Sequence, residues 1–299
     1  MSHIFVSGLV NTETTLRIRE FPIPYYPIDY PFFGVNTAVS GVGDNISKAL
    51  RTLGDQVTLV SMTGRDIPGT TIFQELESIG VDTGQIKTKL KQTPSSVVLY
   101  DGEGRRQIYC DLKDIQETDY GFTPEVCEGV DLVVACNINY NRPLLKIAKQ
   151  AGKTIATDVH VLRDIDDDYN RDFMASANIL FLSDEGIGEN YHDFLRDLGQ
   201  TYGNQIIVLG RGSKGAALHL PKTGEFYELN AVRVGEVVNT VGAGDALFSA
   251  FNHYYTKGLE PLEALKRAQL FASAKIGANG ASNGFITEQQ LEQLYGSFA

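Results

Sequence analysis

The sequence has few cysteines, no cluster of basic residues and no long apolar run, and each shortage argues against a class of protein. Three cysteines, an odd number without CxxC spacing, favour a reduced cytoplasmic protein over a disulfide-stabilised secreted one. Acidic residues outnumber basic ones by 37 to 26, which argues against binding nucleic acid or an anionic membrane surface. No stretch approaches the roughly 18 apolar residues that span a membrane.

The first ten residues favour a strand over a signal peptide, because they lack a basic start and a small-residue cleavage site. With 299 residues, 42% of them apolar, the chain can bury a large core without disulfide or metal staples. Length alone suggests two domains, but one α/β domain with an appendage fits equally well.

Short apolar runs alternate with longer amphipathic stretches along most of the chain. The runs expected as buried strands are 4–10, 57–62, 132–136, 154–158, 179–182 and 206–209. The stretches expected as helices are 45–53, 70–79, 142–151, 191–202, 243–256, 261–278 and 287–295. Apolar strands separated by helices predict a parallel sheet covered by helices on both faces.

Two segments interrupt this alternation. Segment 21–33 holds four prolines interleaved with aromatic residues, which excludes a helix. Segment 95–112 alternates and has a turn signal at 101–104, which predicts a hairpin. Both segments can be plain surface loops. We favour an aromatic flap over a binding site, because exposed aromatic side chains usually have a partner.

The strongest motif for chemistry is the run from Asn239 to Asp245, which precedes an apolar helix. Gly242, Ala243 and Gly244 are small, so their amides are exposed at a helix N-terminus, where the helix dipole attracts an anion. Asp245 lies beside those amides and either caps the helix or accepts a proton. A carboxylate beside an anion cradle is what phosphoryl transfer to an alcohol requires.

A second glycine-rich motif, 40–45, precedes the helix expected near residue 46. Gly41 and Gly43 allow close approach of a polar ligand, and the Asn45 side chain offers both a donor and an acceptor. A plain loop with a helix cap is the alternative. A third motif, GxGxxG at 210–215, leads into an apparent strand at 216–220, so it predicts a hairpin turn and not a dinucleotide-binding loop.

Together the motifs at 242–245 and 41–45 resemble those of the pfkB (ribokinase-like) carbohydrate kinases. Residues 64–69 are similar to that family's GxDxxG and residues 80–83 to its GVDT, so the resemblance spans nearly the whole chain in order. It implies a ribokinase-like α/β fold, a parallel-sheet sandwich covered by helices on both faces with a small β-sheet lid. The core would take residues 1–11, 39–92 and 117–299, and the lid residues 12–38 and 93–116.

The resemblance also implies the activity: transfer of the γ-phosphoryl group of ATP, with Mg²⁺, to a hydroxyl of a sugar-like small molecule. Asp245 matches the catalytic base, and the amides of Gly242, Ala243 and Gly244 match the anion hole. A nucleoside kinase and a catalytically weak ligand-binding homologue are the alternatives.

Further site residues follow from the same resemblance. The substrate side takes Asn11, Gly41, Asn45 and Asp158, with Arg106 as a basic residue of the flap that either meets a phosphorylated substrate or is merely solvated. The nucleotide side takes Ser183, Arg211, Gly212, Gly215, Asn279 and Gly280. His160 has either a functional or a packing role.

Three positions depart from the family pattern. Asn239 replaces an aspartate that often helps to organise a monovalent-cation site, so the need for such a cation stays open. Residues 183–186 replace the family's NxxE, and Asp184, Glu185 and Glu189 are the candidates to substitute for it. Of these, Glu185 is named as the magnesium ligand, acting through water. Glu13 is the nearest candidate for an acidic substrate ligand. Because unpaired strand edges attract partners, we also expect a homodimer through the lid.

Overall fold

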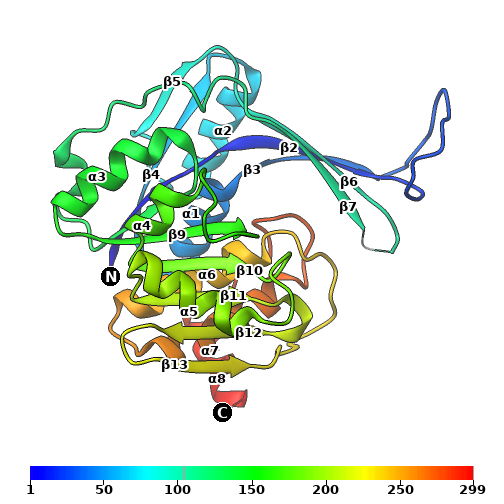
Figure 1. Ribbon diagram of the computed structural model, residues 1–299. Coiled ribbons are helices and arrows are strands. Elements are labelled where there is room, and N and C mark those ends of the chain that lie inside the picture. Colours follow the sequence, from blue (N-terminus) through cyan, green and yellow to red (C-terminus); the bar gives the residue numbers. More distant parts are fainter. Residues whose placement is uncertain (104, 299) are drawn as a thin grey trace.

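The main body of the computed structural model, which describes residues 1–103 and 105–298, is built on a nine-stranded sheet (Figure 1). The strands are β1 (His3–Ser7), β4 (Gln56–Gly64), β5 (Ile86–Leu90), β8 (Leu132–Ala135), β9 (Thr154–Val161), β10 (Ile179–Ser183), β11 (Ile206–Gly210), β12 (Ala216–Leu220) and β13 (Glu225–Leu229). Their order is β13-β12-β11-β10-β9-β8-β1-β4-β5. From β11 to β5 all neighbours run parallel, as predicted, whereas β12 and β13 add an antiparallel edge.

Helices cover both faces of this sheet, as expected. They are α1 (Val42–Leu53), α2 (Ile67–Ser78), α3 (Arg142–Gln150), α4 (Arg171–Ser176), α5 (Tyr191–Tyr202), α6 (Ala243–Thr256), α7 (Pro261–Lys275) and α8 (Glu288–Phe298). Ile4 and Val6 face the core under α1, α6 and α7, and Phe5 faces the core under α3, α4 and α5. This alternation follows from the two-residue period of a strand. Within the described residues, no helix is long and apolar enough to cross a membrane.

A second, four-stranded sheet projects from the body (Figure 1). It consists of β2 (Asn11–Arg17), β3 (Val35–Ser40), β6 (Ser95–Tyr100) and β7 (Arg106–Asp111), in the order β3-β2-β6-β7. We call this sheet, with the segment 18–34, the lid. Two expectations reach residues outside the described part of the chain: Gly104 in the expected turn at 101–104, and Ala299 at the end of the expected core.

Segment 18–34 has neither helix nor strand, and the absence of a helix from 21–33 is what its prolines predict. It connects the distal ends of β2 and β3, and it lies at the tip of the lid away from the body (Figure 1). Phe32 and Phe33 are 85% and 101% exposed there. The expected aromatic flap over the site is therefore wrong for this conformation, because about six residues of strand carry the loop roughly 20 Å outward.

The GxGxxG run confirms its interpretation as a hairpin turn. It joins β11 to β12, which pair antiparallel, through a short 3-10 turn at Gly212–Lys214. No helix follows the glycines, so this loop offers no helix N-terminus to a pyrophosphate.

Candidate active site

The two glycine-rich motifs, which are 200 residues apart in sequence, meet in the structure. Asn45 lies in the first turn of α1 and Asp245 in the first turn of α6, and these two helices pack against each other. The Asn45 Nδ2 group donates a hydrogen bond of 2.7 Å to Asp245 Oδ2. The two side chains that the sequence analysis assigned to one site are therefore in direct contact.

Close backbone contacts explain the glycines of the N-terminal motif. Gly41 has φ 108°, and a Cβ atom there would lie 2.5 Å from the carbonyl oxygen of Leu9. A Cβ atom on Gly43 would lie 2.8 Å from the carbonyl carbon of Gly8. These contacts seat α1 directly on the segment that follows β1, which fixes the position of Asn45.

The N-terminus of α6 is open in one direction and tightly packed in the other. Gly242 has φ 79°, and a Cβ atom on it would lie 2.1 Å from the carbonyl oxygen of Ala281. Gly244 is exposed, and a Cβ atom there would meet nothing within 4 Å. The open side of this helix end is thus the side on which an anion can approach.

The three amides expected to form the anion hole are not equivalent. Those of Gly242 and Gly244 make no hydrogen bond within the part of the chain that the structure describes. The amide of Ala243 donates to the carbonyl oxygen of Thr240 at 3.2 Å, so it is already engaged. The anion hole stays a prediction, and its two glycine amides are the available donors.

The carboxylate of Asp245 has an unusual electrostatic environment. Burial raises its pKa above the ordinary value for an aspartate, and the nearby Asp158 raises it further. His160, the hydrogen bond from Asn45 and the charge of Lys275 oppose this rise. A carboxylate that is fixed by a donor and has a raised pKa is suited to accept a proton.

Polar side chains at the base of the lid form one wall of the site. Asn11, the first residue of β2, is buried and donates from Nδ2 to Ser96 Oγ at 3.1 Å. Its Oδ1 atom has no partner among the described residues. Two residues further along β2, burial raises the pKa of Glu13, and the neighbouring Asp245 raises it further.

Two residues near the end of β9, Asp158 and His160, lie close enough to Asp245 to act on its pKa. The amide of His160 donates to Asp158 Oδ1 at 2.8 Å, and the ring nitrogen Nδ1 lies 3.6 Å from Asp158 Oδ2. His160 adopts φ 59°, a left-handed conformation that is rare outside glycine and often marks functional sites. Its ring is close enough to act on the pKa of Asp245, and its functional or packing role stays a prediction.

Lys275 is a component of the site that sequence reasoning missed. It is the last residue of α7, its side chain is fully buried, and its Nζ atom donates to the carbonyl oxygen of Val241. Burial lowers its pKa to about 8, against the opposing charges of Asp245 and Glu13. The sequence signal was a single basic residue at a helix C-terminus, where lysine is common on exposed surfaces.

Residues expected on the nucleotide side gather from neighbouring strand ends and one loop. Ser183 pairs with Gly210, so the turn that carries Gly212 and Gly215 lies beside it. The guanidinium of Arg211 is already engaged: it lies over the Tyr191 ring and donates to Glu228 at 3.2 Å.

Asn279 and Gly280 belong to the loop after α7. The next residue in that loop, Ala281, packs on Gly242. Gly210, at the start of the turn 210–215, lies near Leu247 of α6. The nucleotide-side assignment stays a prediction.

No ready-made metal cage accompanies these residues. Among residues 1–103 and 105–298, no group of three or more His, Cys, Asp or Glu side chains could hold a metal ion. The Glu185 side chain is exposed in the turn after β10. This fits Mg²⁺, which is commonly held by nucleotide phosphates, water and one or two carboxylates. Glu185 stays a prediction as the ligand through water.

Arg106 does not join the other substrate-side residues in this conformation. It pairs with Tyr100 at the distal end of the lid, whereas Ser95 pairs with Asp111 near Asn11. Five strand residues separate the two ends, or about 17 Å. A contact between Arg106 and substrate would require the lid to move.

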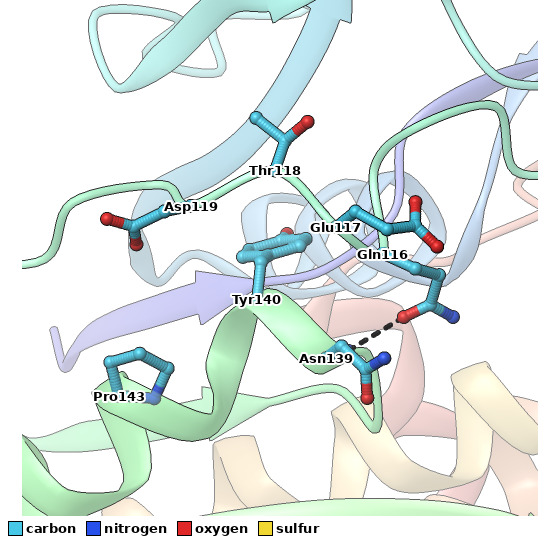
Figure 2. Close-up of a pocket in the computed structure, with 7 residues that line it drawn as sticks. All are labelled: Gln116, Glu117, Thr118, Asp119, Asn139, Tyr140 and Pro143. Carbon is cyan, nitrogen blue, oxygen red and sulfur yellow. Dashed lines mark hydrogen bonds between the residues drawn. The ribbon is translucent and has the colours of Figure 1, made fainter.

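A shallow, open hollow of about 300 Å³ lies elsewhere. Figure 2 shows its lining. The lining residues are Gln116, Glu117, Thr118, Asp119, Asn139, Tyr140 and Pro143. Asn139 donates its amide to Gln116 Oε1 at 3.0 Å there. None of the residues expected in the site lines this hollow, so it forms no part of the candidate active site.

Comparisons with known proteins agree with this geometry. Residues 8–288 match the family described as pfkB family carbohydrate kinase. The chain is 25% identical over 293 residues to an ATP-dependent ribose-1-phosphate kinase of Halopiger xanaduensis, covering 94% of each chain.

Solved structures show the same fold. A microbiome-derived acarbose kinase has a TM-score of 0.87 at 22% identity, with 99% of each chain covered. The nucleoside kinase of Methanocaldococcus jannaschii has a TM-score of 0.80 at 17% identity, also with 99% of each chain covered. Given the family match and the meeting of its two motifs, this chain belongs to the pfkB family and is a carbohydrate kinase with the ribokinase-like fold.

Proposed function

We propose that the protein transfers the γ-phosphoryl group of MgATP to a hydroxyl of a neutral sugar or sugar-like molecule, with Asp245 as the base. The observation that carries this proposal is the hydrogen bond between Asn45 and Asp245 at the open N-terminus of α6. It joins an oriented carboxylate to a helix end that can hold an anion.

Each group has a separate task in this proposal. The amides of Gly242 and Gly244 and the α6 dipole stabilise negative charge on the moving phosphoryl group. Asp245 accepts the hydroxyl proton while the substrate oxygen attacks phosphorus and the bond to the ADP leaving oxygen breaks. Mg²⁺, when bound with ATP, neutralises charge on the phosphates. Asn45 orients the base, and fixed geometry supplies part of the rate.

The charges around Asp245 favour a neutral acceptor over a phosphorylated one. Asp158 raises the pKa of Asp245, and Asp245 in turn raises the pKa of Glu13. Three carboxylates are therefore close enough to interact. The lysine among the described groups coupled to Asp245 is the buried Lys275. A substrate phosphate near these carboxylates would be repelled, whereas sugar hydroxyls can donate to them.

The first test is a panel of acceptors with coupled detection of ADP. The panel contains neutral sugars, sugar phosphates including ribose 1-phosphate, and nucleosides. We expect the highest kcat/KM with a neutral sugar. Transfer to nucleosides alone would favour a nucleoside kinase, and thermal stabilisation by sugars without ADP release would favour a ligand-binding homologue.

The second test removes the base. Asp245→Asn keeps the shape and its contact with Asn45 but cannot accept the proton, so we expect turnover to fall about 10²-fold or more. Asp193→Asn is the matched control, because Asp193 also lies in the first turn of a helix, α5, and pairs with Arg196 on the surface. Near-normal turnover of Asp245→Asn would refute the proposed role.

A further inference from the structure

Lys275 needs an explanation that packing does not provide. Lysine is among the residues least often buried without a partner, because its ammonium loses hydration. Lys275 is fully buried at the end of α7, and its Nζ atom contacts the carbonyl oxygen of Val241. That carbonyl belongs to the turn directly before Gly242, the first residue of the expected anion hole.

Side chain and backbone of α7 hold this turn together. The amides of Val238 and Asn239 both donate to the carbonyl oxygen of Ile276, at 2.8 and 3.1 Å. The Val241 amide donates to Asn239 Oδ1 at 2.9 Å, which leaves its carbonyl to face Lys275. The turn that presents Gly242 is therefore fixed at one end by backbone bonds and at the other by the ammonium.

The ammonium also acts on the reacting carboxylates through its charge. Lys275 lowers the pKa of Asp245 and of Glu13, and these two carboxylates in turn favour the charged form of Lys275. Lys275 is thus a buried positive charge that acts on Asp245 and contacts the 239–242 turn. A free monovalent cation bound by carbonyl oxygens would supply the same charge. Asn239, being neutral, gives the turn no carboxylate to attract one.

We propose that Lys275 is a built-in cation of the transfer site: its ammonium positions the 239–242 turn and balances Asp245, so that turnover needs no added monovalent cation. Lys275 is a positioning residue that acts through Val241 and Asp245, and the proposal rests on the kinase function proposed above. The lysine ammonium is a compact point charge, similar in kind to a potassium ion, and it cannot be lost by dilution.

The test on the unaltered protein varies the monovalent cation. Initial rates are measured with MgATP and the most active acceptor of the panel, in potassium, sodium or tetramethylammonium chloride at constant ionic strength. We expect equal rates in all three salts. An active enzyme that potassium stimulates several-fold would overturn the proposal. Complete inactivity with every acceptor would instead count against the kinase function itself.

Substitutions at Lys275 test the charge directly. Lys275→Met keeps the length without the charge, and we expect kcat to fall about 10- to 100-fold, with a smaller change in the KM for ATP. Lys275→Ala should fall similarly and regain activity with ammonium, potassium or methylamine ions, because it leaves a buried space beside the Val241 carbonyl. Lys275→Met should gain little activity from added cations, because its side chain fills that space.

Controls separate this role from a purely structural one. Lys266→Met alters another lysine of α7, one that pairs with Glu263 at the surface, and should leave kcat unchanged. Circular dichroism establishes the temperature range in which each variant is folded, and rates are compared within it. If folded Lys275→Met keeps full kcat, or if no cation raises kcat of folded Lys275→Ala, Lys275 is not the built-in cation.

Discussion

Asp245 is one of several coupled charges, so its environment decides when it can act. Burial and Asp158 favour its protonated form, whereas Asn45, His160 and Lys275 favour the carboxylate. The net effect is a raised pKa. When the solution is acidified, Asp245 therefore gains its proton at a higher pH than an exposed aspartate does, and it can then no longer act as a base.

We expect a bell-shaped dependence of kcat/KM on pH. On the acid side the rate falls as Asp245 gains a proton, and its raised pKa places this limb above the range of an ordinary aspartate. On the alkaline side the rate falls through about pH 8 as Lys275 loses its proton. Initial rates across this range, at saturating MgATP, give both limbs.

Two variants assign the limbs. Asn45→Ala removes a donor that stabilises the carboxylate, so its acid limb should move to higher pH. Lys275→Met has no ammonium to lose, so its remaining activity should lack the limb near pH 8. If the acid limb keeps its position in Asn45→Ala, the titrating group is not Asp245.

At the scale of elements, the start of α6 depends on two glycines in different ways. Gly242 combines a positive φ with a backbone contact from Ala281, so any side chain there meets both strain and a clash. Gly244 has open space around its α-carbon, so a methyl group would cost the fold little. The same space is where the phosphoryl group is expected to sit.

Alanine substitutions should therefore separate stability from activity. We expect Gly242→Ala to lower the free energy of unfolding by about 1–3 kcal/mol, because of strain and the clash with Ala281. Gly244→Ala should change it by less than about 1 kcal/mol, since alanine favours helix. Gly244→Ala should still lose about tenfold or more in kcat, because its methyl group displaces the anion.

Urea unfolding followed by circular dichroism measures the first effect, and ADP release measures the second. The pair provides its own control, because the two positions lie two residues apart at the start of α6. Equal stability of the two variants would show that the backbone at Ala281 shifts at little cost to make room for a side chain at position 242. Full activity of Gly244→Ala would show that the phosphoryl group does not approach this amide.

At the scale of the whole molecule, the lid exposes both apolar side chains and strand edges. Tyr25, Phe32 and Phe33 are exposed at its tip. β3 and β7 are the edges of its sheet, and every side chain of β7 is exposed. Unpaired edges and aromatic patches attract a partner chain.

We expect a homodimer in which the lids of two copies cover each other. Light scattering coupled to size-exclusion chromatography should give twice the mass of the chain. The double variant Tyr25→Ser, Phe32→Ser should shift this mass toward the monomer. Ile67→Ser, which removes an equally exposed apolar side chain from α2 on the body, should not. A monomer for the unaltered chain at all concentrations would contradict the prediction.

The sequence predicted local structure well where a residue type restricts the backbone in one particular way. Helix α6 was expected at 243–256, the bounds that the structure shows, because small residues precede an apolar run. Prolines excluded a helix from 21–33, and the structure has none there. β5, β13 and α4 were missed, because short elements carry too few residues to show a period.

The candidate site was predicted in parts. Asp245 and Asn45 were identified from their motifs, and the roles proposed for them still await measurement. Lys275 was missed, because nothing local reveals that α7 buries its last side chain. The aromatic segment 21–33 was expected to cover the site. Its composition indicates that the aromatic side chains need a contact surface, but it does not show on which side of the molecule that surface lies.

The sequence by itself determined the six apolar parallel strands of the main sheet, which glycines need freedom, and which carboxylate follows a glycine-rich turn, because those properties depend on neighbours along the chain. Only the tertiary structure decided that Asn45 lies 2.7 Å from Asp245 and that the lid tip faces away from the site. It also decided that the buried ammonium of Lys275 contacts the 239–242 turn and acts on Asp245. Such relations join residues far apart in sequence, and they form only when the helices pack on the completed sheet.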